Sequence, residues 1–203
     1  MAIDSYMAFK LHQNSVYAKA ADSSSLLLLA ESQVDFSQNT NDPLFKEPLK
    51  LAQGQVFEVE DYSFDIEQTL NIGSQSSGAG AGKVTFNPFS ITRKIDKASP
   101  IFFEMACSGV PFESVLLALR KSSGTGTAGS FFLSFFFKLV AVKTISWAHD
   151  DESPKETVTF EYGGLQVRYS QQRPDGTLMN AVPGGWNRVR NIKDQDSGPL
   201  TTS

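Results

Sequence analysis

The stretch KVTFNPFSITRKIDKASPIFFEMACSG, residues 83–109, holds the features that decide the fold. Its first half alternates apolar and polar residues with a period of two, which is typical of a strand. Val84 and Phe86 share one parity, whereas the apolar residues that follow Pro88 have the other. Proline has no N–H to donate within a sheet, so it is tolerated at bends and edges. The pattern therefore predicts a strand that bends near Pro88.

The second half of the stretch predicts a helix. Ser99 is suited to cap its start, because a serine side chain can accept a hydrogen bond from a free N–H of the first turn. Pro100 fits the first helical position, where no N–H is needed, and Gly109 suits a left-handed stop.

The predicted helix has a broad apolar face. Ile101 and Met105 lie four residues apart, as do Phe103 and Cys107, and this spacing brings each pair onto one side of a helix. We expect Cys107 to be a small buried hydrophobe, since no Lys, Arg or His flanks it to lower the pKa of its thiol.

Several other segments have strand patterns. Residues 56–68, VFEVEDYSFDIEQ, change phase near Asp61, which predicts a bulge or sharp bend. The phenylalanine-rich segment 131–147 is interpreted as one long strand or two joined strands, and Gly163-Gly164 as a hairpin turn or a glycine bulge within one strand. Strands that bend belong to small barrels or orthogonal sandwiches. We predict a mainly β fold: a small barrel of bent strands with one short flanking helix and an extended loop.

Length and composition set limits on the class of protein. The chain has 203 residues, a net charge of −4 and one cysteine. We predict one domain over residues 1–192, in which 12–54 form an insertion or an extended loop, and a flexible tail over 193–203. The negative charge argues against nucleic-acid binding. The single cysteine excludes an internal disulfide. The lack of a long apolar run argues against membrane insertion.

The chemical motifs fail when their full requirements are applied. SSGAGAGKVTF, residues 76–86, looks like a phosphate-binding loop, but Ser77 replaces the first glycine and Val84 replaces the Mg²⁺-binding hydroxyl. The two histidines are too few for a zinc site without nearby cysteines. Glu58 and Glu60 share one face of a strand, as a pair of glycosidase carboxylates would. Solvated side chains on the face of a strand give the same pattern. We therefore expect no enzymatic activity, no cofactor and no metal.

The two tryptophans leave a second function open. Trp147 or Trp186 could stack on a sugar ring, as in a non-enzymatic β-sandwich carbohydrate-binding module. Packing in a core or an interface is the ordinary role of such residues.

An ordered set of motifs runs through the chain. The set begins with Gly82-Lys83, the bent strand, and Thr92 to Pro100 at the start of the helix. It continues with LLALRK (116–121), PKETVTFEYGGLQVRYS (154–170) and the glycine- and tryptophan-containing close PDGT…PGGW (174–186). Over about residues 56–190, and in the same order, this set resembles the Hcp family, the tube protein of type VI secretion systems.

This resemblance implies a structural function. Family members form hexameric rings that stack into a tube inside a contractile sheath, and the tube carries a spike and effectors out of the cell. It implies folding in the bacterial cytoplasm and export without a signal peptide. We also considered a specialised tube protein in which residues 12–54 carry or form an effector.

The family has a long loop that reaches a neighbouring subunit or ring, and it corresponds here to about residues 69–82. The resemblance therefore implies that this loop makes subunit or ring contacts through Leu70, Ile72, Ser74, Gly78, Ala79 and Gly80.

Overall fold

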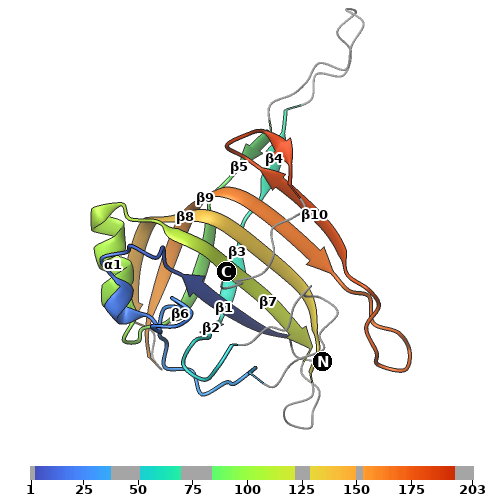
Figure 1. The fold of residues 1–203 in the computed structure, drawn as a ribbon, viewed down its shortest axis with the longest axis horizontal. Helices are drawn as coiled ribbons and strands as arrows, with labels where there is room; N and C mark the ends of the chain where they lie inside the picture. The colour runs from blue at the N-terminus through green and yellow to red at the C-terminus, as the bar shows by residue number, and fades with distance from the viewer. Residues whose placement is uncertain (1–2, 38–50, 70–83, 122–128, 150–152, 195–203) are drawn as a thin grey trace, which may run out of the picture.

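The computed structural model describes residues 3–37, 51–69, 84–121, 129–149 and 153–194 (Figure 1). These residues form mostly β-strands, with one α-helix and one short 3₁₀ helix, so the prediction of a mainly β fold is confirmed. The elements are β1 (Ile3–Lys10), η1 (Ala18–Ala20), β2 (Phe57–Val59), β3 (Asp61–Ser63), β4 (Ile66–Gln68), β5 (Val84–Phe86), β6 (Phe89–Lys94), α1 (Ser99–Ser108), β7 (Phe112–Lys121), β8 (Phe131–His149), β9 (Pro154–Tyr169), β10 (Val182–Asn187) and β11 (Ile192–Lys193).

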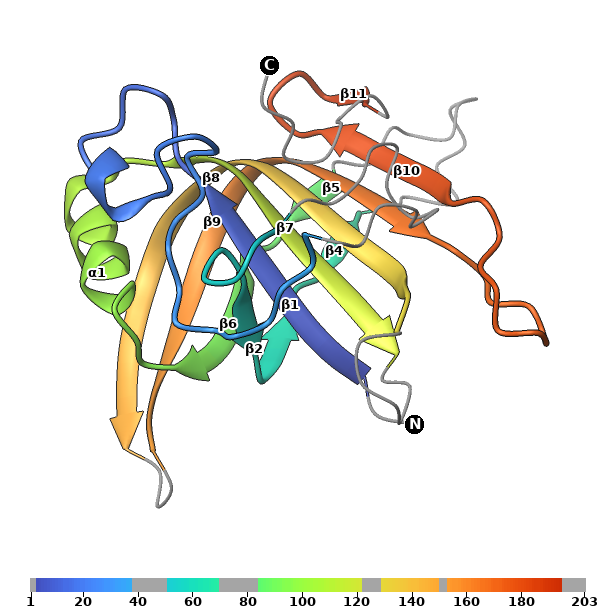
Figure 2. The same ribbon diagram turned by 60° about the horizontal axis from the view of Figure 1, so that its bottom comes forward.

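One antiparallel sheet organises the chain. Its strands follow the order β11-β10-β9-β8-β7-β1-β2, and β6 pairs with both β3 and β9. β4 and β5 pair only with each other. Figure 2 shows β1, β7, β8 and β9 side by side as a strongly curved surface, with α1 at one end and β10 at the other.

Both predicted changes of phase occur where a strand is interrupted. β2 ends at Val59 and pairs with β1, whereas β3 begins at Asp61 and pairs with β6. β5 likewise ends at Phe86, and β6 begins at Phe89. At each break the chain changes its partner strand. Because the apolar pattern changes phase there, side chains before and after the break face the same core. The two predicted bends are confirmed.

The long strands β8 and β9 are each continuous. β8 has 19 residues, and β9 has 16 residues and runs through Gly163-Gly164 without turning, so the hairpin alternative is wrong. Leu139 in β8 has a φ of 50°. A Cβ on Gly163 would lie 3.3 Å from Leu139 Cβ and 3.3 Å from Val189 Cγ2. Gly163 therefore allows β9 to approach this irregular point of β8.

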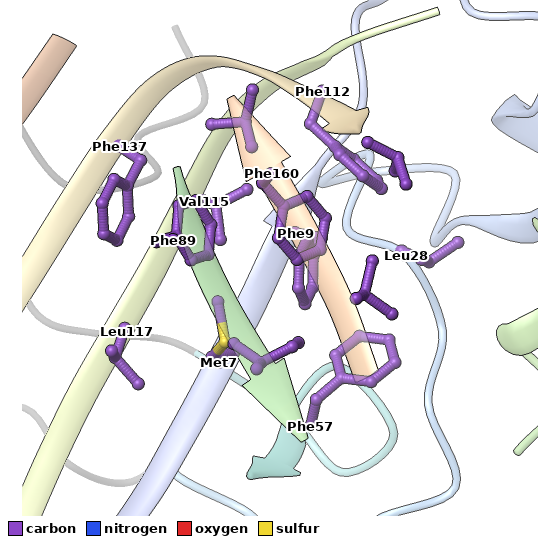
Figure 3. Packing of buried hydrophobic residues seen from close by; sticks show 14 of the residues in the cluster. Met7, Phe9, Leu28, Phe57, Phe89, Phe112, Val115, Leu117, Phe137 and Phe160 are labelled. Atoms are coloured by element: carbon purple, nitrogen blue, oxygen red, sulfur yellow. The ribbon is translucent and has the colours of Figure 1, made fainter. Parts of the chain in front are cut away.

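The main core is rich in phenylalanine (Figure 3). Phe89 stacks between Phe137 and Phe160, with ring centroids 4.1 Å and 4.7 Å apart. The fully buried rings of this cluster come from β1, β2, β6, α1, β7, β8 and β9: Phe9, Phe57, Phe89, Phe102, Phe112, Phe137 and Phe160. The alternating apolar residues thus bury one face of each of these six strands.

A second core lies on the opposite face of β1, β7 and β8. It contains Tyr6, Ala8, Leu27, Phe36, Leu51, Val56, Leu116, Ala118, Phe131 and Phe136. Four of these residues come from the segment between β1 and β2, so the described parts of 12–54 cover this face of the sheet. The second core also explains why β7 is apolar on both faces.

The start of α1 differs from the sequence prediction. The cap position is Ala98, and no side chain caps the helix. Ser99 is the first helical residue and Pro100 the second, so the expected cap by Ser99 is wrong by one position. The physical reason is that Ser99 Oγ accepts from Arg93 Nη2 and from the Asp96 N–H and donates to the buried Glu156 carboxylate, so its bonds lie outside the first turn. Gly109 ends the helix with a φ of 70°, as predicted.

The buried face of α1 also differs. Phe102 and Met105 are buried against the sheet, whereas Phe103 and Cys107 are exposed. Residues 102 and 105 are three apart and share the stripe that faces the sheet, and residues 103 and 107 lie on another side of the helix. The prediction of a buried Cys107 is therefore wrong.

Candidate assembly surface

A buried ion pair joins β6 to β9 near the start of α1. Arg93 and Glu156 stand directly opposite each other in the strand register, and their side chains are 3% and 0% exposed. Arg93 Nε donates to Glu156 Oε1 at 2.8 Å, and Arg93 Nη2 lies 2.7 Å from the same oxygen. Buried charges are tolerated only when their remaining hydrogen bonds are also satisfied.

Residues at the start of α1 supply those hydrogen bonds. Arg93 Nη2 donates to Asp96 Oδ1 at 2.7 Å, and Ser99 Oγ donates to Glu156 Oε1 at 2.9 Å. The guanidinium also lies over the rings of Phe57 and Phe102, at 4.9 Å and 5.0 Å from their centroids. This network fixes the first turn of the helix against two strands.

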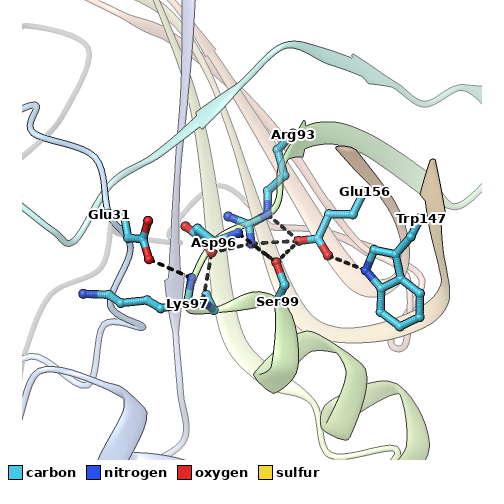
Figure 4. A network of polar contacts seen from close by, with 8 residues as sticks. Glu31, Arg93, Asp96, Lys97, Ser99, Trp147 and Glu156 are labelled. Carbon is cyan, nitrogen blue, oxygen red and sulfur yellow. Dashed lines mark hydrogen bonds and ion pairs between the residues drawn. The ribbon is translucent and has the colours of Figure 1, made fainter. Parts of the chain in front are cut away.

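The network also orients an exposed tryptophan (Figure 4). Trp147 Nε1 donates to Glu156 Oε2 at 3.1 Å, although Trp147 itself is 52% exposed. Phe103 of α1 lies beside it, with ring centroids 5.9 Å apart, and is 45% exposed. We call Phe103 and Trp147 the aromatic pair. A buried carboxylate thus holds a large surface side chain in one orientation.

An apolar pocket of about 410 Å³ lies far from the aromatic pair. The β4–β5 hairpin, the second half of β9, and β10 form it, and Figure 1 shows these strands away from α1. We call it the hairpin pocket; it is lined by Ile66, Gln68, Val84, Phe86, Leu165, Val167, Gly184, Gly185 and Trp186.

Glycine keeps the hairpin pocket open. Gly184 pairs with Val167, which places both residues on the pocket side of the sheet. A Cβ on Gly184 would meet no heavy atom within 4 Å. Any larger side chain at this position would project into free space, so the pocket exists partly because residue 184 has none.

The predicted contact-loop residues cannot be placed. Leu70, Ile72, Ser74, Gly78, Ala79 and Gly80 lie outside the described residues. In the sequence they connect β4 to β5, the hairpin that forms one wall of the pocket. Their role in subunit contacts remains a prediction.

The other residues considered for chemistry lie apart. Glu58 Oε1 accepts from Ser32 Oγ at 2.7 Å, whereas Glu60 forms an ion pair with Lys155 at 3.0 Å, so the two carboxylates have separate partners.

Among the residues that the structure describes, no group of three His, Cys, Asp or Glu could hold a metal ion. No helix in the described part of the chain is long and apolar enough to span a membrane.

Tyr162 is buried in the main core beside Phe86, Phe89 and Phe137. Its hydroxyl has no hydrogen-bond partner in the described part of the chain. Burial raises the pKa of Tyr162 to about 12, because a phenolate would lose its hydration in this core.

Comparison with known proteins decides the family. The family model described as "Type VI secretion system effector, Hcp" matches residues 52–169, which include both strand bends, the Arg93–Glu156 pair and α1. The chain belongs to the Hcp family. It is therefore a type VI secretion tube protein, and the carbohydrate-binding alternative is not favoured.

Individual relatives agree with this assignment. The Hcp-family chain is 29% identical to Protein hcp1 of Pseudomonas aeruginosa over 112 residues. The aligned residues cover 55% of this chain and 69% of that protein. It is similar in fold to a structure described as a type six secretion system protein, with a TM-score of 0.65, 20% identity, and coverage of 95% and 100% of the two chains. Hcp1 from Salmonella typhimurium gives a TM-score of 0.57, 17% identity, and coverage of 95% and 100%.

Sequence reasoning about this Hcp-family chain missed the buried network, although the sequence contained a signal for it. Arg93 has the same strand parity as Phe89 and Ile91, and Glu156 has the same parity as Val158 and Phe160. A charged residue at a core position of each of two strands indicates a buried pair. No comparable signal marks the hairpin pocket, since its lining comes from four separate segments of the sequence.

Proposed function

We propose that this chain forms hexameric rings that stack into the inner tube of a type VI secretion system. The observation that carries the proposal is the family match across residues 52–169. The similarity in fold to a type six secretion system protein across 95% of the chain supports it. In this proposal the protein is a structural subunit without enzymatic activity.

We propose further that the strands close into a small barrel through the bent segment 57–63. The support is that β2 pairs with β1, β3 pairs with β6, and β6 pairs with β9. Together with the β9-β8-β7-β1 run, these pairings leave β2 and β3 as the two ends, and the bent segment 57–63 that contains both strands would join them. A closed sheet has no open edge along its body.

The proposed assembly pathway follows from the tube function. Residues 1–192 form one domain with a tail over 193–203, and it folds in the bacterial cytoplasm. Its rings stack within a sheath, beneath a spike, and leave the cell with effectors. The two cores support a single domain, since they join residues from Tyr6 to Leu165.

The loop between β4 and β5 is proposed to contact a neighbouring subunit or ring. Gly78→Glu or Ala79→Glu should then reduce assembly, measured by light scattering and negative-stain electron microscopy, without changing the melting temperature. Asn14→Glu is the matched control, because Asn14 is an exposed residue of another loop. Assembly of both loop variants at the level of the control would contradict the role of the loop.

A further inference from the structure

We infer that the aromatic pair of one subunit, Phe103 and Trp147, inserts into the hairpin pocket of the next subunit around the ring. The inference rests on the proposed ring and adds the surfaces that join its subunits. Each subunit would give its aromatic pair to one neighbour and accept the pair of the other neighbour in its pocket.

The aromatic pair has the properties of a binding anchor. Large, rigid aromatic side chains supply much of the binding energy at the centre of protein interfaces, and tryptophan is among the most enriched. Trp147 is half exposed, yet its indole N–H is held by Glu156, which is itself fixed by Arg93 and Ser99. A side chain ordered before binding loses less conformational entropy on association. The network thus prepares this surface for a partner.

The hairpin pocket has the chemistry and size to accept such an anchor. Its lining is almost entirely apolar, with Gln68 as the one polar side chain. Its volume of about 410 Å³ falls in the range of roughly 300–1,000 Å³ in which pockets enclose whole organic groups. Gly184 leaves open space above β10, so an aromatic ring can approach the floor of the pocket.

The positions of the two surfaces favour a second copy of this chain as the occupant. The aromatic pair comes from α1 and β8, whereas the pocket is lined by residues of β4, β5, β9 and β10. Figure 2 shows α1 and β10 at opposite ends of the curved sheet. One surface projects and the other is hollow, so neither matches itself across a two-fold axis. Contact between two different surfaces of identical chains is head-to-tail, and such contacts form a ring when the rotation between subunits closes, as it does in the proposed hexamer.

The experiment uses one variant of each surface in the full chain. Phe103→Glu places a charge on the aromatic pair and leaves the Glu156 network intact, because Phe103 has no part in it. Gly184→Leu fills the pocket at a position with free space and an ordinary φ. Val16→Glu is the control, since Val16 is another apolar side chain and is 77% exposed. Circular dichroism melts establish that all variants are folded.

Sedimentation velocity gives the decisive readout. We expect wild type and Val16→Glu to sediment as rings, and Phe103→Glu and Gly184→Leu alone to sediment as monomers. An equimolar mixture of the two monomeric variants should form heterodimers and nothing larger, because the first keeps an intact pocket and the second an intact aromatic pair.

Each other result overturns the inference. If both variants form rings, the two surfaces are not the ring contact, and the proposed function stands. If the mixture stays monomeric, the surfaces matter but are not each other's partners. If wild type and Val16→Glu form no rings, the proposed function itself fails. Binding of a sugar that Trp147→Ala abolishes, with rings unchanged, would assign the aromatic pair to a different ligand.

Discussion

Replacing the buried carboxylate of Glu156 tests the physical basis of the fold. Glu156→Gln keeps the shape of the side chain and removes its charge. It leaves the Arg93 guanidinium, whose side chain is 3% exposed, without the fully buried one of its two counter-charges. Breaking a buried ion pair by neutralising one partner costs about 3–5 kcal/mol, because the other charge remains buried.

The structure places the expected cost at the lower end of that range. Asp96 Oδ1 stays 2.7 Å from Arg93 Nη2 and still compensates part of the positive charge. We therefore expect Glu156→Gln to lower the free energy of unfolding by about 3 kcal/mol. With a urea m-value of about 2 kcal/mol/M, the unfolding midpoint should fall by about 1.5 M.

The assay is urea unfolding of the isolated subunit, followed by tryptophan fluorescence. The exposed Glu58→Gln is the control and should change the free energy by less than about 0.5 kcal/mol. The double variant Arg93→Met with Glu156→Leu should be more stable than Glu156→Gln, since it removes both charges. A cost below about 1 kcal/mol for Glu156→Gln, or a double variant less stable than the single, would refute the reasoning.

Two further predictions concern Tyr162 and Gly109. Tyr162→Phe should raise the free energy of unfolding by about 1 kcal/mol at pH 7, because it removes a buried hydroxyl without a partner in the described part of the chain. Because the pKa of Tyr162 is raised in the folded state, the unfolded state ionises first, and the free energy of unfolding falls as the pH rises from 10 to about 12. Urea unfolding across this pH range should show the fall in wild type and a smaller fall in Tyr162→Phe. Gly109→Ala should lower the free energy of unfolding by about 1 kcal/mol. The cost comes from the φ of 70° alone, since a Cβ at this position meets no atom within 4 Å. A melting temperature equal to that of wild type would contradict this backbone strain.

The sequence pattern predicted the elements whose physics is local. Alternation of apolar residues located the strands, and the changes of phase near Asp61 and Pro88 located two breaks, because side chains of a strand alternate between its faces. Gly109 was predicted as a helix stop because its backbone conformation suits glycine.

The remaining features depend on contacts between distant segments. The sequence of Gly163-Gly164 also fits a turn, and the close approach of Leu139 and Val189 explains why glycine stands at position 163 within a continuous strand. Ser99 has a side chain suited to a helix cap, but its hydroxyl donates to Glu156, which lies 57 residues away in the sequence. The second core brings residues 27–36 onto β1 and β7, and periodicity cannot show that a loop will cover a sheet.

Electron microscopy of the purified full chain tests the central claim most directly. Negative-stain images of a concentrated sample should show six-fold rings with an open centre, some of them stacked, as expected for a type VI tube subunit. A field of compact single particles with no rings at any concentration would contradict the account.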